Sequence, residues 1–308
     1  MADPPPPRAA VRPGGGLARR RPGLTGTDGL LVLMTAIWGV NYIVIKAALK
    51  VFSPLAFNAA RFLLAAPAVG LVAWAWHTRR PSRRALVQLA GLGLLGHTIY
   101  QLSYIEGMAR ARAGSAALIM AAVPVLTAAA SHGLGHERLR RQDVAGLALS
   151  TVSLAILVVG GDAGARGGAV AGNLLILLAA VLWTAYTLWA KSLVDTLGPV
   201  ATTAWSMGLG AVPLLAICAP AALAQPWAAV TPAAWGAVLF SSLLSLALAY
   251  LIWYRGVERL GATRTAFYSN FSPAITLLAA WPLLGEVPTV WQLAGAAGVF
   301  GSLAVVRS

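Results

Sequence analysis

Charged side chains are scarce in this chain: Asp, Glu, Lys and Arg make up 10% of its 308 residues, whereas hydrophobic residues make up 58%. A soluble globular domain carries charge on roughly a quarter of its residues. The scarcity excludes a soluble domain and indicates an integral membrane protein.

Acidic residues are scarcer than basic ones: the chain has nine Asp and Glu and 23 Lys and Arg, so its net charge is +14. In a soluble chain this balance would suggest a nucleic-acid partner. Here the basic residues are spread through short loops and lack one concentrated folded face, so we expect no nucleic-acid binding.

Cysteine and histidine are also nearly absent. Cys218 is the single cysteine and lies in an apolar run, which excludes disulfides and cysteine-rich metal sites. The four histidines, His77, His97, His132 and His136, have no acidic companions at ligand spacing on one helix, and no phosphate-cradling glycine loop with a lysine is present. We therefore expect no metal, no other cofactor and no ATP-driven step.

Long apolar runs are what the chain has in abundance. A run of roughly 18 residues or more can cross a hydrocarbon core of about 30 Å. Ten such runs lie near residues 29–50, 54–76, 87–106, 113–134, 143–160, 170–190, 199–219, 233–254, 263–284 and 290–306. The prediction is an all-α integral membrane protein with ten transmembrane helices, preceded by a Pro-, Gly- and Arg-rich tail over residues 1–27 that we expect to be disordered.

The distribution of Lys and Arg predicts the orientation of these spans. With the N-terminus inside, 17 of the 23 basic residues fall on the cytoplasmic side, five fall on the other side, and Arg61 lies within a span. An excess of Lys and Arg in short cytoplasmic loops is the usual topology signal of membrane proteins. We therefore expect a multi-pass protein of the cell (inner or plasma) membrane with both termini in the cytoplasm.

Two halves of the chain repeat each other. Pairs separated by 149 positions are Gly107/Gly256, Arg110/Arg259, Ala117/Ala266, Pro124/Pro273, Thr127/Thr276, Glu137/Glu286, Gly146/Gly295 and Ser153/Ser302, and pairs separated by 145 are Trp38/Trp183, Lys46/Lys191 and Pro54/Pro199. Because each half holds an odd number of spans, the two copies face opposite ways across the bilayer. We predict two inverted five-helix repeats, over residues 28–161 and 168–308, which is a recurring architecture of secondary transporters.

Several short motifs resemble one known family. In chain order they are Trp38-Gly39-Val40-Asn41, Pro54 followed by Arg61-Phe62, Tyr100-Gln101-Leu102-Ser103-Tyr104-Ile105-Glu106-Gly107, Pro124, and Gly135-His136-Glu137-Arg138. With the duplication, they make the chain from about residue 29 to its end similar to an EamA-type member of the drug/metabolite transporter (DMT) superfamily. The resemblance implies a ten-helix, exporter-like fold that moves small metabolites, often amino acids or related compounds, or drug-like solutes.

The second half departs from the first at three matching positions. Thr184, Tyr186 and Ser206 stand where the first half has Gly39, Asn41 and Arg61. Whatever Asn41 and Arg61 do, the two halves therefore do not do it symmetrically.

The first helix carries the core of the predicted substrate site. Trp38, Asn41 and Tyr42 lie three or four residues apart and share one side, which Lys46 continues toward the outer end. An amide offers donors and an acceptor to an amino or carboxylate group, and an indole offers a flat apolar surface that attracts cations. The alternative is that Trp38 packs between helices and Asn41 bonds across them.

Two further helices carry matching or similar patterns. Trp183 and Tyr186 on the sixth helix occupy the positions of Trp38 and Asn41, which favours a cavity. On the third helix His97, Gln101 and Tyr104 form a polar stripe on an otherwise apolar span. His97 has a side chain that could carry a proton, but a lone histidine is more often a satisfied structural donor.

The eighth and ninth helices complete the predicted substrate-binding residues. Tyr250 and Trp253 lie three residues apart on the eighth helix, so they share one side of it. On the ninth, Tyr268 belongs to a polar stripe near Asn270.

Charged residues inside or near spans are candidates for gating or coupling, because a charge in lipid costs several kcal/mol unless it is paired or solvated. Arg61 could bind an anionic substrate group or pair with Glu106, or it could only tie its helix to carbonyls or a carboxylate near the interface. Glu106 suits proton coupling or an ion pair with Arg110 at (i, i+4). Lys46 is the third residue of this group.

Alternating access is the predicted mechanism, with a solute bound near the midplane between the two halves and carried across when the halves rock. Pro124 and Pro273 hold matching positions in the fourth and ninth helices. Proline removes a backbone donor and weakens a helix, so we predict that both are hinge points.

A membrane-embedded enzyme and a channel are the competing interpretations. An enzyme would need a nucleophile with a base, or a metal-ligand cluster, at membrane depth, and the sequence shows neither. Bulky Trp and Tyr residues interrupt the polar stripes, which is more typical of a closed cavity than of an open pore. We expect a transporter and not an enzyme, with a small-molecule substrate and the lipid bilayer as partners. Small residues on most spans suit close packing within one chain or a homodimer, so the chain is a monomer or a homodimer.

Overall fold

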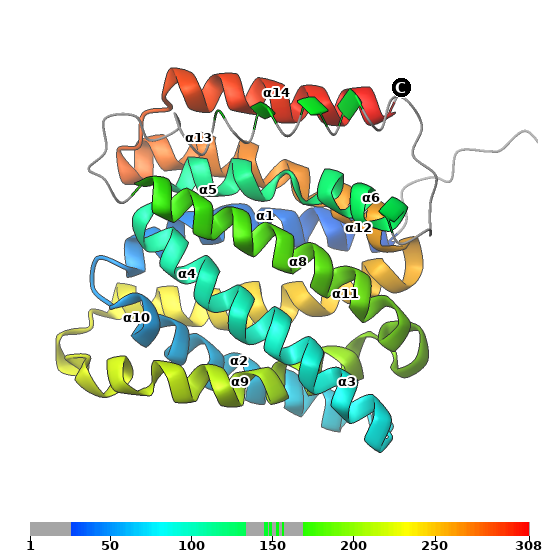
Figure 1. Cartoon of the computed structure of the whole chain (residues 1–308). Helices are drawn as coiled ribbons and strands as arrows, with labels where there is room; N and C mark the ends of the chain where they lie inside the picture. Colours follow the sequence, from blue (N-terminus) through cyan, green and yellow to red (C-terminus); the bar gives the residue numbers. More distant parts are fainter. Residues whose placement is uncertain are drawn as a thin grey trace, which may run out of the picture.

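The computed structural model describes residues 26–133 and 169–307, with residues 145–146, 148–149, 152–153 and 156 between them. Over these residues it is all-helical, and Figure 1 shows the helices packed side by side as a bundle. Within this part of the chain, seven helices are long and apolar enough to cross a membrane. The predicted tail, apart from its last two residues, and most of the predicted fifth span lie outside the described residues.

The described elements follow the predicted order of apolar runs. They are α1 (Gly26–Ala48), α2 (Pro54–Ala75), α3 (Arg83–Gly93), η1 (Leu94–Ile99), α4 (Tyr100–Arg110), α5 (Ala113–Met120), α6 (Val123–Gly133), α8 (Ala169–Leu197), α9 (Pro199–Ala224), η2 (Trp227–Ala229), α10 (Pro232–Leu239), η3 (Phe240–Leu248), α11 (Ala249–Leu260), α12 (Ala262–Tyr268), η4 (Ser269–Phe271), α13 (Ser272–Leu284) and α14 (Val290–Arg307).

Local chemistry explains where several helices begin. The Ser53 hydroxyl accepts a hydrogen bond from the Ala56 amide, and Pro54 follows as the first residue of α2. Thr231 and Pro232 start α10 in the same way. A side-chain oxygen at this position satisfies an otherwise unpaired amide, and proline loses nothing there because its missing donor has no partner in the first turn.

Two predicted spans are continuous rods that contain a π-helical segment. Residues 83–110 form α3, η1 and α4 without a break, and residues 232–260 form α10, η3 and α11. In a π-helix the backbone bonds run from i to i+5 instead of i to i+4, so the faces of the rod before and after the segment are rotated relative to a regular helix. The assumption of uniform helical spacing therefore fails in these two spans.

Two other predicted spans are interrupted. The span at 113–133 is broken at Ala121 and Ala122 between α5 and α6, and the span at 262–284 passes through the 3₁₀ turn η4 between α12 and α13. Pro124 and Pro273 lie in the first turns of α6 and α13. The two prolines therefore sit where new helices begin rather than within an unbroken one.

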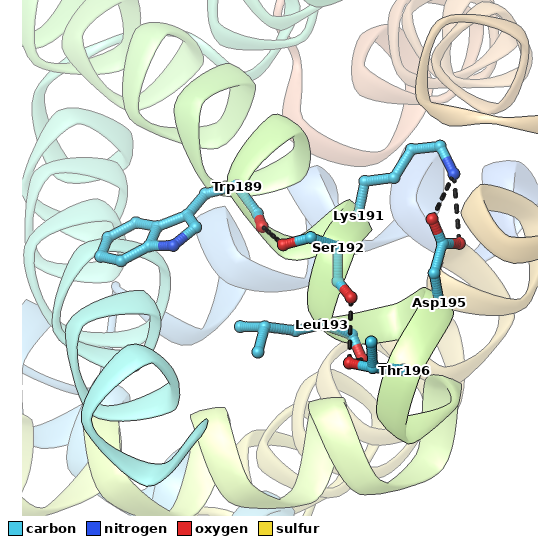
Figure 2. Close-up of polar contacts among 6 residues, drawn as sticks. All are labelled: Trp189, Lys191, Ser192, Leu193, Asp195 and Thr196. Carbon is cyan, nitrogen blue, oxygen red and sulfur yellow. Dashed lines mark hydrogen bonds and ion pairs between the residues drawn. The ribbon is translucent and has the colours of Figure 1, made fainter. Parts of the chain in front are cut away.

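The end of α8 extends beyond the predicted span. Figure 2 shows Lys191 paired with Asp195, its Nζ lying 3.1 and 2.8 Å from the two carboxylate oxygens, while the Thr196 hydroxyl donates to the Ser192 carbonyl at 3.0 Å. The Trp189 ring points away from this pair. These last turns are polar and bond within their own helix, which lets the helix continue outside the apolar run.

Glycines allow α3 and α9 to cross at very short range. A Cβ on Gly93 would lie 2.3 Å from the Ser206 carbonyl oxygen, and a Cβ on Gly210 would lie 2.3 Å from the Gly93 carbonyl oxygen. The Thr98 hydroxyl also donates to the Gly210 carbonyl at 2.8 Å. Small residues at helix crossings are the usual means of close packing where no hydrophobic effect drives association.

The bundle is apolar outside and partly polar inside. Large hydrophobic side chains such as Trp74, Leu223 and Leu278 are 78–88% exposed. Asn41, Arg61, His97 and Gln101 are buried. This distribution is the reverse of a soluble protein and suits a lipid environment around a polar interior.

Candidate functional site at the centre of the bundle

A small central cavity lies where the two parts of the chain meet. It encloses about 50 Å³ and is lined by Trp38, Asn41, Tyr42, Arg61, Tyr100, Gln101, Tyr104, Ala117, Met120, Ala121, Val123, Trp183, Ser245, Leu246, Tyr250, Ser269 and Ser272. A water molecule needs about 10–15 Å³ of such volume, so the space holds a few waters. The cavity is therefore contracted in this conformation and must widen to take a metabolite.

Aromatic rings form one wall of the cavity. The centroid of Trp38 lies 5.6 Å from that of Trp183 and 5.4 Å from that of Trp253. Trp183 also lies 5.1 Å from Tyr250 and 5.2 Å from Tyr100. These spacings are those of favourable aromatic pairs, so the rings pack against one another as one continuous wall.

The rings that form this wall are held in place by packing and one backbone bond. The indole nitrogen of Trp38 donates to the Ser245 carbonyl at 3.1 Å. Trp253 is fully buried against Trp38 and Trp183, behind the residues that line the cavity. Trp253 is therefore a support for the wall.

Hydrogen bonds join the polar residues of the cavity across the bundle. The Ser241 hydroxyl donates to Oδ1 of Asn41 at 2.7 Å, which connects η3 to α1. Nε2 of Gln101 donates to the Tyr250 hydroxyl at 2.9 Å, while Oε1 of Gln101 is buried and has no hydrogen-bond partner. The amide of Gln101 thus has one acceptor to offer.

His97 and Tyr186 belong to a second layer outside the cavity. The Tyr186 hydroxyl and Nε2 of His97 are 2.9 Å apart, and the same ring nitrogen is 3.3 Å from the Ser206 hydroxyl. Both side chains are fully buried, and neither lines the cavity. Their hydrogen bonds give them a structural role in tying η1 to α8 and α9.

Among the described residues that line the cavity, Arg61 is the only charged one. Its side chain is buried, with a relative exposure of 1%. Nη1 is 3.4 Å from Oδ1 of Asn58, and the guanidinium carbon lies 5.6 Å from the centre of the Phe57 ring. A buried cation with so few partners is unusual, because desolvation costs several kcal/mol unless an opposite charge offsets it.

Both interrupted spans contribute to the cavity. Ala121 and Val123 line it at the break between α5 and α6, and Ser269 and Ser272 line it at η4 and the start of α13. Broken helices in transporters occur where irregular backbone lines a cavity and is shielded from lipid.

Bonds from α1 to the α12–α13 region join these elements from the end at which α1 begins to the depth of the cavity. The Tyr268 hydroxyl donates to Asp28, and the Thr35 hydroxyl donates to the Tyr268 carbonyl at 2.9 Å. Thr276 donates to the Gly39 carbonyl at 2.9 Å. Tyr268 thus lies at one end of the bundle and not in the cavity wall.

A second set of bonds joins elements at the opposite end of the bundle. Nζ of Lys46 donates to the carbonyls of Met108 and Ala111 at the end of α4, at 3.1 and 2.8 Å. The Ala113 amide donates to Glu286 at 2.9 Å, which connects α5 to the turn after α13. Hydrogen bonds between elements of the bundle therefore lie at both ends of the cavity.

Glu106 lies near the Lys46 end of the bundle and pairs with Arg110 four residues later. The sequence allowed Glu106 to pair with Arg110 or with Arg61. In the structure it pairs with Arg110, so its carboxylate does not neutralise Arg61.

Arg61 and seven of the predicted substrate-binding residues lie around the cavity. The seven are Trp38, Asn41, Tyr42, Gln101, Tyr104, Trp183 and Tyr250. Of the remaining predicted substrate-binding residues, His97, Tyr186, Trp253 and Tyr268 lie elsewhere as described, and the side chain of Asn270 lies outside the described residues.

Tyr100 in the cavity wall and Asp28 at the end of the bundle were not among the predicted site residues. Tyr100 lines the cavity, and its position four residues before Tyr104 could have identified it. His97, three residues earlier, lies in the π-helical segment and behind the cavity wall, although regular helical spacing would place it on one face with Tyr100. Asp28 also escaped, because a carboxylate in the first turn of a helix looks like an ordinary favourable charge at the helix dipole.

Comparison with known proteins identifies the family. A model described as the EamA-like transporter family matches residues 26–159 and again residues 170–308. The chain belongs to the EamA-like transporter family.

Two relatives and one solved structure resemble this EamA-family chain along most of their length. A probable amino-acid metabolite efflux pump of Salmonella typhimurium is 30% identical over 291 residues, covering 90% of this chain and 93% of the relative. A probable terminal-alkyne amino-acid exporter of Streptantibioticus cattleyicolor is 27% identical over 278 residues, covering 90% and 92%. A crystal structure with 23% identity and a TM-score of 0.61 covers 91% of this chain and 96% of its own, and it has the same fold.

Family membership and the apolar helices together define the broad function. This EamA-family chain is a multi-pass membrane transporter of small molecules and not an enzyme.

Proposed function

We propose that this transporter is a secondary exporter that moves small metabolites by alternating access through the central cavity. The observation that carries the proposal is the cavity itself: a small central space with aromatic and polar walls, lined by elements from both parts of the chain. A channel would need a continuous pore, whereas the central space holds a few waters and hydrogen bonds join the elements at both of its ends.

The architecture behind this mechanism is ten spans in two inverted five-helix repeats, over residues 28–161 and 168–308. Residues at matching repeat positions touch each other: the Trp38 and Trp183 rings are 5.6 Å apart, and Gln101 bonds Tyr250 at 2.9 Å. Counterparts meet in this way when they lie near the two-fold axis that relates two copies. These contacts therefore support an axis through the cavity.

The order of helix contacts supports the same arrangement. α1 packs against α11 and α13, and its counterpart α8 packs against α4 and α6. The two run in opposite directions, because the Lys46 end of α1 and the Gly172 start of α8 both lie against the end of α4. The interruptions at 121–122 and 269–271 also match under the repeat offset of 149 positions.

Orientation in the membrane follows from charge. With both termini in the cytoplasm, 17 of the 23 Lys and Arg residues lie on that side. The cell (inner or plasma) membrane is the proposed location.

The proposed substrates are amino acids or related compounds, or drug-like solutes. Both relatives described above carry names that refer to export or efflux of amino acids or their metabolites. Asn41, Gln101 and Arg61 would hold the polar groups of the solute, and the aromatic wall of Trp38 and Trp183 its body.

Pro124 and Pro273 are the proposed hinge points. Each follows an interruption that lines the cavity, so a change of angle there would widen or narrow the space around the solute. Replacing either proline should change the transport rate more than the solute affinity.

Solute counterflow in proteoliposomes tests the proposed function, with a panel of labelled amino acids, purines and organic cations. We expect a saturable signal that falls at least about tenfold in Trp38→Ala, because the variant removes the ring that joins both halves of the wall. Trp74→Ala is the matched control, since Trp74 is 78% exposed on the outer surface. Saturable flux that survives Trp38→Ala would place the site elsewhere, and the absence of flux for every compound from folded protein would contradict the proposed function.

A further inference from the structure

The charge balance of the cavity is one-sided. Arg61 lines it, and none of the Asp or Glu residues in the described part of the chain does. The ion pairs found in the same part join Arg110 to Glu106, Lys191 to Asp195 and Arg259 to Glu258. Within the described part of the chain, the cavity therefore carries a positive charge that no carboxylate neutralises.

The guanidinium is also poorly hydrogen-bonded. A guanidinium has five N–H donors in a planar fork. Nε of Arg61 has no partner, and the bond from Nη1 to Asn58 is stretched to 3.4 Å. The phenols of Tyr100, Tyr104 and Tyr250 line the same cavity, and a neutral phenol supplies no compensating charge.

The side-chain amides of Asn41 and Gln101 differ in the hydrogen-bonding groups that they can offer to a solute. Oδ1 of Asn41 is occupied by Ser241, so the Asn41 amide has N–H donors to offer. Oε1 of Gln101 is the buried acceptor without a partner. The site thus provides a strong, charged position for an anion and a weak, neutral acceptor for an N–H group.

From these observations we propose that Arg61 is the subsite for a carboxylate on the transported solute, with the aromatic wall of Trp38, Trp183 and Tyr250 holding an apolar or aromatic body. This inference rests on the proposed function and deepens it by naming the substrate class. The solute is a small monocarboxylate in which an amino group is optional, and an organic cation without an acidic group is excluded.

Simple energetics set the order of preference. A buried charge left without its partner costs far more than a neutral hydrogen bond left unmade. Loss of the carboxylate should weaken recognition by about 100-fold or more, whereas loss of the amino group should weaken it by about tenfold or less. The two oxygens of a carboxylate can also accept two parallel hydrogen bonds from a guanidinium, whereas a single-atom anion cannot.

Competition in proteoliposomes tests the inference with three compounds that share a phenyl body. Counterflow of labelled L-phenylalanine is measured against unlabelled 3-phenylpropionate, which has only the carboxylate, and 2-phenylethylamine, which has only the amine. In the unaltered protein we expect 3-phenylpropionate to compete at concentrations about 100-fold lower than 2-phenylethylamine.

Variants then assign the preference to one side chain. Arg61→Gln should lose phenylalanine counterflow and the preference for the carboxylate, and Arg61→Lys should keep part of both because it retains the charge without the fork. Arg110→Gln is the matched control, because Arg110 is an exposed arginine paired with Glu106 away from the cavity. If Arg61→Gln does not fold, the competition ratio in the unaltered protein still decides the question.

The outcomes separate this inference from the proposed function. Equal competition by the amine and the carboxylate, or transport of an organic cation without transport of phenylalanine, would overturn the carboxylate subsite and leave the transporter intact. Unchanged preference in folded Arg61→Gln would also overturn it. Absence of flux for every compound of the wider panel would instead overturn the proposed function.

Discussion

The crossing of α3 and α9 makes Gly210 a position where one methyl group should destabilise the protein. A Cβ there would lie 2.3 Å from the Gly93 carbonyl oxygen and 2.8 Å from Cβ of His97, whereas ordinary contacts begin at 3.4 Å. The two backbones must therefore separate by about 1 Å. The same movement stretches the 2.8 Å bond from Thr98 to the Gly210 carbonyl.

The expected magnitude for Gly210→Ala follows from three terms. Overpacking costs about 1–3 kcal/mol, and a weakened hydrogen bond adds up to about 1 kcal/mol. Alanine returns up to about 1 kcal/mol because it is the better helix former. The hydrogen-bond and helix-propensity terms roughly cancel, so the net loss is about 1–3 kcal/mol, which at roughly 2–4 °C per kcal/mol lowers the Tm by about 2–12 °C.

Thermal unfolding of the purified protein in detergent measures this loss. Gly208→Ala is the control, because it is on the same helix and a Cβ there meets nothing within 4 Å. It should leave the Tm unchanged or raise it slightly through helix propensity. Equal Tm values for Gly210→Ala and Gly208→Ala would refute the reasoning that the glycine permits close backbone approach.

Two further predictions concern the hydrogen bonds at the two ends of the bundle. Lys46→Met removes the donor to two carbonyls at the end of α4, so hydrogen exchange there should quicken about tenfold or more, while exposed Lys50→Met should change nothing. Similar exchange in both variants would contradict the capping role. Tyr268→Phe removes the bond to Asp28 that joins α1 to α12, so a cysteine introduced as Ser245→Cys, in a protein freed of its native cysteine, should react severalfold faster with a water-soluble thiol reagent. Unchanged labelling would show that this bond does not help to close the cavity.

The sequence predicts the helical elements well because the signal for a span is long and additive. Each apolar run of about 20 residues must be helical in lipid, since every backbone group needs an internal partner. Regular helical spacing also predicts that Trp38, Asn41 and Tyr42 share one face. Because α1 is a continuous α-helix, this holds in the structure, and all three line the cavity.

Irregular backbone limited what could be predicted. The π-helical segment η1 brings Tyr100 to the cavity and His97 to the layer behind it, and no residue type marks such a segment in the sequence. The break at Ala121 and Ala122 is also unmarked, because alanine favours a continuous helix. Tertiary packing decides these features, so spacing alone could not place the residues that depend on them.

The mismatch between Arg61 and Ser206 has a consequence for how such a site can be built at all. Two identical halves facing each other would each bring a guanidinium to the same small, poorly solvated space, and like charges there would repel strongly. A single chain with two different halves brings one guanidinium, and at the matching place a serine that bonds His97 instead. Joining unlike halves thus lets an almost symmetric scaffold hold an asymmetric electric field, with a positive pole on one side only.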